Sequence, residues 1–87
     1  MSKYPYDYTL SRENSATIFK RACSKISDAM ATLNETPLLT DVDGTTIQAY
    51  EGEDGRRIVV YDDYDVGAVY VLSDFEIQKQ LEELIAR

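Results

Sequence analysis

Carboxylates are the side chains of this sequence whose types and spacing come nearest to a reactive site. Half of the 16 acidic residues fall between residues 41 and 65. They are Asp41, Asp43, Glu51, Glu53, Asp54, Asp62, Asp63 and Asp65. Paired carboxylates can exchange protons in a pocket or bind a divalent cation. Here they occupy stretches rich in Asp and Gly that favour exposed tight turns, so we predict hydrated carboxylates and no catalytic residue.

Residues 41–45 read DVDGT and resemble the D-x-D-G-T signature of the haloacid dehalogenase-type phosphatases. The resemblance implies a nucleophile at Asp41 and a general acid at Asp43, with Mg²⁺ bound beside them. The downstream pair at 62–63 is similar to the acidic metal-binding motif of that family. The family also has a longer, parallel α/β domain and a catalytic lysine between the two motifs, where this chain has only the arginines at 56–57. We therefore interpret the segment as a hairpin turn.

The same acids do not fit the pattern of a calcium-binding loop. An EF-hand loop requires glycine at its sixth position and glutamate at its twelfth. Counted from Asp41, those positions hold Thr46 and Gly52, so the pattern fails. Weak binding of a divalent cation by Asp62, Asp63 and Asp65 stays open as an alternative, but we predict no dedicated metal site and no cofactor.

Histidine is absent, and Cys23 is the single cysteine. The chain therefore lacks the usual general base near neutral pH and the commonest metal ligand. One cysteine forms neither an internal disulfide nor a cysteine-based zinc site. On these grounds we do not expect an enzyme.

The length and net charge of the chain limit the class of protein to which it can belong. The 87 residues are predicted to form a single domain, 1–87. A net charge of −7 argues against direct binding of nucleic acid and suits attraction to a basic partner. No apolar run approaches the roughly 18 residues of a membrane span, and the first ten residues lack the apolar stretch of a signal peptide. We therefore expect a cytoplasmic location.

Helical periodicity appears on both sides of the central region. Apolar residues recur every three or four positions within 11–34, with Ser11 as N-cap, which predicts the first helix. The sequence of 73–86 begins with a capping box, Ser73 with Glu76, and predicts the second helix. The tyrosines of residues 1–10 alternate as in a strand, but Pro5 limits this segment to an edge strand or an extended arm.

Residues 38–72 alternate short β-type runs with turns, and two of the turns contain Asp-Gly. Two-residue type I′ turns favour that dipeptide, so we predict a four-stranded antiparallel meander. The expected fold class is α+β, in the order α-β-β-β-β-α, with both helices on one face. That face would hold the aliphatic residues, and Tyr50, Tyr61 and Tyr70 would stand on the open face. The predicted core is Ile18, Ile26, Met30, Leu33, Ile47, Ile58, Val60, Val69, Ile77, Leu81 and Leu84.

Alternate turns of a meander lie at the same end of the sheet, so the Asp43 turn and the 62–65 loop should share a rim. We predict that this rim docks on a basic, nucleic-acid-binding surface of a partner protein, by mimicry of nucleic acid. The candidate contact residues are Asp43, Asp62, Asp63, Asp65, Tyr61, Tyr64, Glu53, Asp54, Tyr50 and Tyr70. In size and charge the chain is similar to the small acidic inhibitors of phages, including anti-CRISPR and anti-restriction proteins, although no motif carries that likeness.

A second hypothesis is a structural or assembly module. In it the tyrosine-rich sheet face, or an exposed sheet edge, forms a homodimer or a complex with a scaffold protein. Tyrosine is favoured at such contacts because it is amphipathic and has few rotamers to immobilise. Neither hypothesis involves a membrane.

Overall fold

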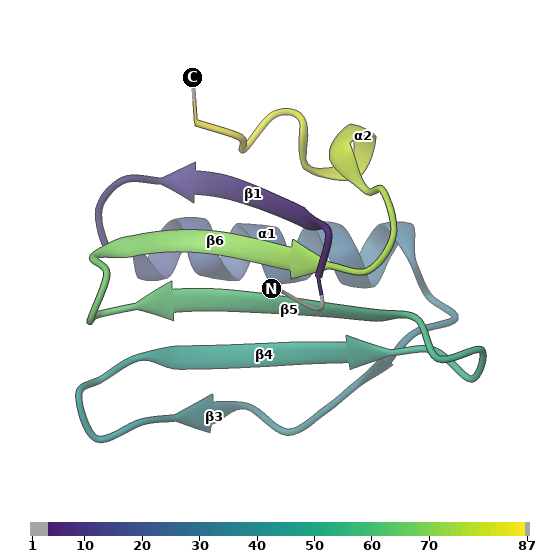
Figure 1. Ribbon diagram of the computed structural model, residues 1–87, viewed down its shortest axis with the longest axis horizontal. Coiled ribbons are helices and arrows are strands. Elements are labelled where there is room, and N and C mark those ends of the chain that lie inside the picture. The colour runs from purple at the N-terminus through teal and green to yellow at the C-terminus, as the bar shows by residue number, and fades with distance from the viewer. Residues whose placement is uncertain (1–3, 87) are drawn as a thin grey trace.

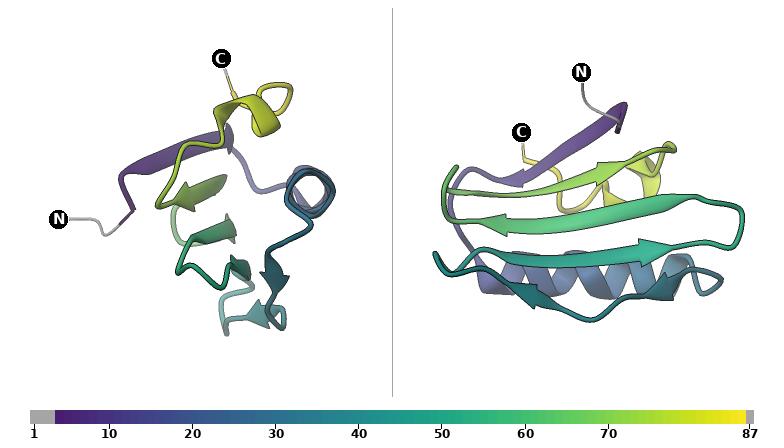
Figure 2. Two further views of the ribbon diagram at one scale, coloured as in Figure 1. Left: turned by 90° about the vertical axis from the view of Figure 1, so that its right-hand side faces the viewer. Right: turned by 60° about the horizontal axis from the view of Figure 1, so that its bottom comes forward.

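An antiparallel sheet with one long helix across a single face makes up the chain in a computed structural model, which describes residues 4–86 (Figures 1 and 2). The elements are β1 (Tyr6–Ser11), α1 (Ala16–Ala29), β2 (Asn34–Glu35), β3 (Leu39–Thr40), β4 (Thr46–Glu51), β5 (Arg57–Asp63), β6 (Ala68–Ser73) and α2 (Gln78–Leu81). The strand order is β1-β6-β5-β4-β2, and β3 pairs with the same edge of β4 as β2 does, at the other end of that strand. The predicted α+β class and antiparallel sheet are confirmed. The predicted four-stranded meander is wrong, because the sheet has six strands.

Both Asp-Gly hairpins close with one residue more than predicted. In the first, the Gly44 N–H donates to the Asp41 carbonyl over 3.0 Å, and the Asp41 N–H donates to the Thr45 carbonyl over 2.8 Å. Gly44 has a φ of 94°. A type I turn followed by a left-handed glycine is the usual three-residue hairpin loop, and it carries a bulge at the glycine.

The second hairpin repeats this geometry. The Gly55 N–H donates to the Gly52 carbonyl over 3.1 Å, the Gly52 N–H donates to the Arg56 carbonyl over 2.9 Å, and Gly55 has a φ of 89°. The type I′ turn that we predicted would also need a positive φ at Asp54, and no described residue other than glycine has one.

The two longer loops exchange the sheet faces of the side chains in one strand, β4. Its partners in β5 are Gln48 with Val60 and Tyr50 with Ile58, instead of the predicted Ala49 with Val60. Because side chains alternate across a strand, a shift of one residue exchanges the two faces. The second loop shifts the register by one residue again, so the side chains of β5 and β6 lie on the faces predicted for them. Only β4 therefore differs from the predicted division of faces.

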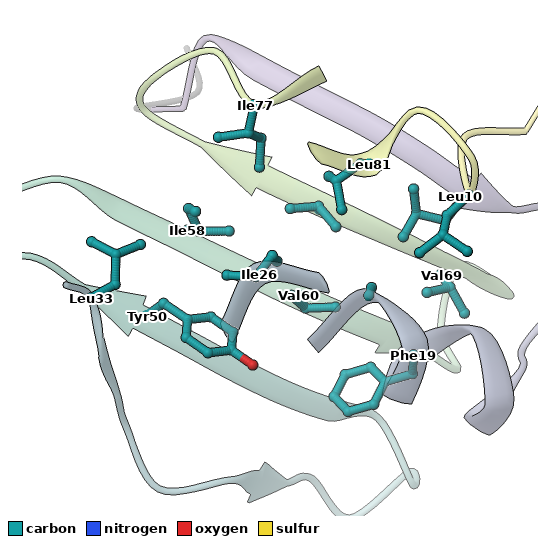
Figure 3. Close-up of a cluster of buried hydrophobic side chains, with 13 residues drawn as sticks. Leu10, Phe19, Ile26, Leu33, Tyr50, Ile58, Val60, Val69, Ile77 and Leu81 are labelled. Carbon is teal, nitrogen blue, oxygen red and sulfur yellow. The ribbon is translucent and has the colours of Figure 1, made fainter. Parts of the chain in front are cut away.

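The face toward α1 holds the core, and Tyr50 belongs to it (Figure 3). Tyr50 is 1% exposed, and its hydroxyl donates to the Cys23 carbonyl over 3.2 Å. The prediction of an open sheet surface for Tyr50 is therefore wrong. Ile47, predicted in the core, is half-buried on the opposite face. The buried cluster comprises Leu10, Phe19, Ala22, Ile26, Leu33, Tyr50, Ile58, Val60, Val69, Val71, Ile77, Leu81 and Leu84.

Helix α1 is shorter than the predicted 11–34. Its N-cap is Ser15, whose hydroxyl oxygen accepts from the Ile18 N–H over 3.1 Å. The predicted cap, Ser11, is the last residue of β1 and accepts instead from the Glu13 N–H. At the other end, β2 begins at Asn34 and pairs with β4. The predicted core residues Ile18 and Met30 of this region are partly buried against the cluster.

The second predicted helix, 73–86, is reduced to the four residues of α2. Ser73 does not form the predicted capping box with Glu76. Its hydroxyl accepts from the Phe75 N–H over 3.1 Å and donates to the Phe75 carbonyl over 2.6 Å. This local turn holds the chain out of helical geometry until residue 78. The segment still places Ile77, Leu81 and Leu84 in the core.

The predicted N-terminal arm, residues 1–10, contains an edge strand. Residues 1–3 lie outside the described part of the chain, and β1 pairs with β6 from Tyr6 onward. Tyr8 accepts at its hydroxyl from the Ile77 N–H over 3.1 Å, which ties this strand to the α2 segment. The Ala86 N–H donates to the Thr9 carbonyl over 2.9 Å and covers part of the strand's free edge.

The register of β4 predicts a large loss of stability in Tyr50→Ala. Removal of a buried aromatic side chain costs about 3–5 kcal/mol, because transfer energy is lost and a cavity is left. We expect Tyr50→Ala to lower the free energy of unfolding in urea at least as much as Ile58→Ala, for which about 2–5 kcal/mol is expected. Tyr64→Ala, an exposed position, is the matched control. A small effect in Tyr50→Ala would contradict the register.

The three-residue loops predict strain in Gly55→Ala. A Cβ at Gly55 meets no atom within 4 Å, so the effect isolates backbone conformation. The left-handed conformation costs a residue with a Cβ about 1–2 kcal/mol, and we expect that loss in urea unfolding. Gly55→Asn should cost less, because asparagine tolerates this conformation. Glu53→Ala in the same loop is the control. An unchanged stability of Gly55→Ala would argue against the positive φ.

Candidate functional site

Two loops meet at one end of the sheet, as predicted. They are residues 41–45 and 63–67, here named the paired-loop end, and they lie at the left of Figure 1. The Tyr64 N–H donates to the Thr45 hydroxyl over 2.9 Å. The Tyr64 ring lies beside Gly44, where an added Cβ would be in van der Waals contact with the ring at 3.7 Å. These contacts hold the two loops against each other.

The paired-loop end exposes apolar and acidic side chains together. Val42 is fully exposed at the tip of its loop, and Val66 and Tyr64 are more than half exposed. Asp43 and Asp65 are exposed beside them. Exposed apolar side chains that gather at one place and are bordered by polar groups mark interaction sites, so this combination is a candidate contact surface.

Asp62 does not belong to this surface. It is 4% exposed, and its Oδ1 accepts from the Asn14 side-chain amide over 2.9 Å. The same amide donates to the Asp63 carbonyl over 3.0 Å. Asp62 therefore ties the segment before α1 to β5, and its predicted place on the rim is wrong.

Asp63 closes the 63–67 loop. Its Oδ2 accepts from the Tyr70 hydroxyl over 2.6 Å, and its Oδ1 accepts from the backbone N–H groups of Asp65 and Val66 over 3.0 and 3.2 Å. The hydrogen bond from Tyr70 is the main cause that lowers the pKa of Asp63, opposed by partial burial. Most of the acceptor capacity of this carboxylate is used by donors in the loop and in β6.

Tyr61 and Tyr70 lie side by side on the sheet face away from α1, here named the outer face. Their rings stack with centroids 4.9 Å apart, and both side chains are half-buried. Burial is the main cause that raises the pKa of each hydroxyl. The prediction that these two tyrosines share a face is confirmed. The Tyr70 hydroxyl also connects this face to the 63–67 loop through its hydrogen bond to Asp63.

Glu53 and Asp54 lie at the opposite end of the sheet, in the loop before β5. Asp54 forms an ion pair with Arg56, with 2.7 Å between Oδ2 and Nε, and its Oδ1 accepts from the Arg56 N–H over 3.2 Å. The charge of this carboxylate is thus balanced locally. These two acids are separate from the paired-loop end.

Val42 and Val66 are contact candidates that are not among the contact residues predicted from the sequence. A signal was present, because each valine stands directly after an aspartate in a turn, where a polar residue is usual. Within residues 4–86, no group of three or more Cys, Asp or Glu side chains is arranged to hold a metal ion. No helix in the described part of the chain has the length and apolar character needed to cross a membrane.

Comparisons with models of protein families, with curated proteins and with solved structures gave no match to this chain.

The hydrogen bond between Tyr70 and Asp63 predicts a pH-dependent effect of Tyr70→Phe. Because the pKa of Asp63 is lower in the folded than in the unfolded chain, its carboxylate stabilises the fold above about pH 4, and this contribution is lost as the pH falls through the lowered value. Tyr70→Phe should raise that pKa toward 3.8. In urea unfolding we expect the difference between the variant and the parent to be larger at pH 7 than at about pH 2.

The control for this prediction is Tyr64→Phe, which removes an exposed hydroxyl from the same loop. Its effect should be small at both pH values. The Asp63 pKa itself is read from the side-chain carboxyl signal in an NMR titration. An equal loss of stability in Tyr70→Phe at both pH values would contradict the assigned role of the hydrogen bond.

Proposed function

We propose that this chain is a protein-binding inhibitor or regulator whose paired-loop end docks on a basic surface of a partner protein. The observation that carries the proposal is the meeting of the two loops, which sets exposed Val42, Tyr64 and Val66 among exposed carboxylates. Asp41, Asp43 and Asp65 are the acids of that surface. Contact surfaces combine apolar anchors with charged groups that set orientation in this way.

Charge and apolar contact have different kinetic effects in such a complex. Carboxylates attract a basic surface at long range and speed association, and salt weakens this attraction. Burial of an apolar or aromatic side chain slows dissociation. The paired-loop end has both kinds of group, so the two effects can be measured separately.

The narrower part of the proposal concerns the partner. A groove that binds nucleic acid is rich in Lys and Arg, because it must neutralise phosphates. A chain of net charge −7, with exposed carboxylates at one end, has the charge needed to occupy such a groove. Size and charge of this kind are shared with anti-CRISPR and anti-restriction inhibitors, and we propose that class of activity on those grounds.

A second candidate is a homodimer or scaffold contact through the outer face. Helix α1 lies on the other side of the sheet, and no helix of residues 4–86 covers the outer face (Figure 2). This face carries the stacked pair Tyr61 and Tyr70 together with half-buried Ile47 and Leu72. In this second candidate function, the outer face is the surface that contacts the other protein.

The proposal is tested with the triple variant Asp41→Asn, Asp43→Asn, Asp65→Asn. Asparagine keeps the oxygen that accepts from the backbone in these turns, so the loops should keep their structure. A partner is first recovered with the parent protein from a cell lysate, then purified, and its binding kinetics are measured at several salt concentrations. We expect about tenfold slower association for the triple variant at low salt, and a weaker dependence on salt.

The matched control removes three exposed carboxylates elsewhere, as Glu53→Gln, Glu76→Gln and Glu82→Gln, and should bind like the parent. Tyr64→Ala should chiefly speed dissociation. A nucleic-acid competitor should displace the parent. Equal binding by the folded triple variant and the parent would refute the role of the paired-loop end. A dimeric mass in solution, lost in Tyr61→Asp, would favour the second candidate.

A further inference from the structure

Strand β3 leaves one side of its backbone without a neighbour. Figure 1 shows it at the rim of the sheet, with no further element of residues 4–86 beyond it. The Asp41 N–H, directly after β3, donates toward β4 to the Thr45 carbonyl over 2.8 Å. Because backbone groups alternate in direction along an antiparallel strand, the N–H and C=O of Thr40 both point away from β4.

The side chains along this edge are apolar and exposed. Leu38 is 56% exposed and Leu39 is 61% exposed, and Val42 in the loop that follows is fully exposed. Edge strands of monomeric proteins are commonly protected by charged side chains, by proline or by a covering element. Pro37 precedes the strand, but residues 38–40 carry no charge. This edge is therefore open to pairing with a further strand.

The opposite edge of the sheet is partly covered by the chain itself. Strand β1 follows Pro5, and the Ala86 N–H donates to the Thr9 carbonyl of β1 over 2.9 Å. Within residues 4–86, no backbone group comparable to that of Ala86 reaches Thr40. Of the two edges, β3 is thus the one whose backbone has groups left for a partner.

The charge of this part of the chain favours a basic occupant. Residues 26–55, which contain β2, β3 and β4, have seven acidic residues and no lysine or arginine. The rest of the chain is balanced, with nine acids and nine bases, so this stretch accounts for the whole net charge of −7. Glu35, Asp41 and Asp43 are its exposed members in or next to β2 and β3. A second copy of the chain would bring two such edges together, and their like charges would repel.

We propose that β3 is the attachment site for an extended basic segment of the partner, which adds to the sheet as a further strand. This attachment rests on the proposed function, in which the partner surface is basic, and it specifies how the partner is held. The backbone of the segment accepts from the Thr40 N–H and donates to the Thr40 carbonyl. Its apolar side chains pack against the exposed Leu38 and Leu39, and its Lys or Arg side chains lie near Glu35 and Asp41.

The probe is a synthetic peptide of about seven residues in which valine and lysine alternate, the length of an ordinary strand. It is titrated into the ¹⁵N-labelled full chain, and the amide signals and their exchange with solvent are followed by NMR. We expect saturable shifts at Leu39 and Thr40, with a Kd of about 1 mM. Exchange of the Thr40 N–H should slow at least about fivefold when the peptide is bound, because this N–H then has an acceptor.

Modified peptides separate the backbone contacts from the charge. Methylation of the backbone nitrogens at every second residue blocks one side of the peptide strand, and two such peptides cover the two sides. One of them should bind at least about tenfold more weakly, and the other within about twofold of the unmodified peptide. Glutamate in place of lysine should weaken binding at least about fivefold. Equal binding by both methylated peptides, or by the glutamate peptide, would overturn the proposal.

Thr40→Pro tests the attachment from the side of the protein. Proline is tolerated in an edge strand where the missing N–H would face solvent, so pairing with β4 should remain. We expect Thr40→Pro to bind the peptide at least about tenfold more weakly. The matched control is Thr40→Val, which keeps the N–H and should bind within about twofold of the parent. Signal dispersion checks folding, and undiminished binding by folded Thr40→Pro would contradict the proposal.

Different outcomes would overturn strand addition and the proposed function. If the peptide moves no signal of β3 up to about 10 mM, strand addition is refuted, and the paired-loop end is still open as a docking surface. If the peptide binds β3 but Asp41→Asn, Asp43→Asn, Asp65→Asn binds the partner like the parent, the docking surface is refuted and the β3 site is supported. A dimer in solution that Thr40→Pro dissociates would identify a second copy as the occupant and overturn the choice of a basic segment.

Discussion

The left-handed backbone at Gly44 and Gly55 decides which side chains of β4 face the helix. Each glycine ends a three-residue loop, and the two loops bound β4 on either side. The resulting register turns Gln48 and Tyr50 inward and Ile47 outward. A core aromatic residue, a buried side-chain amide and an apolar position on the outer face all follow from this backbone conformation.

The sequence was sufficient for much of this fold, for a physical reason. Consecutive β-branched and aromatic residues mark β5 and β6, which favour strands, and the 3–4 spacing of apolar residues marks α1. Asp-Gly marked both hairpins correctly but did not specify the loop length. Two- and three-residue loops accept the same dipeptide, and they differ in the backbone conformation of the aspartate, which has a positive φ in a type I′ turn and does not have one here at Asp43 or Asp54.

Other errors arose where a side chain makes a local hydrogen bond that competes with a helix. Ser73 bonds to Phe75 and Ser11 to Glu13, so neither serine caps a helix. Serine is equally suited to both roles, and the choice depends on the tertiary position of the flanking chain. Likewise, β1 could not be assigned with certainty next to Pro5, since its pairing with β6 is made across most of the chain.

Some acidic side chains form hydrogen bonds or ion pairs within the fold, and others are exposed. Asp62 binds Asn14, Asp63 binds Tyr70, and Asp54 pairs with Arg56. The location of these aspartates at the ends of the sheet was predictable, because they stand in or beside turns and turns gather there. It did not show which carboxylates have their hydrogen bonds satisfied internally, since that depends on neighbours distant in sequence. The exposed members, such as Asp43 and Asp65, remain for contact.

The pairing of β1 with β6 has a consequence for synthesis on the ribosome. Strands β4, β5 and β6 are joined by short loops and can pair as soon as each hairpin emerges. Strand β1 is made first but has to wait until residue 73 is available, because its partner is the last strand. The topology thus predicts that the nascent chain carries an unpaired tyrosine-rich strand until β6 has been made. Closure of β1 onto β6 then completes the sheet in a late, long-range step.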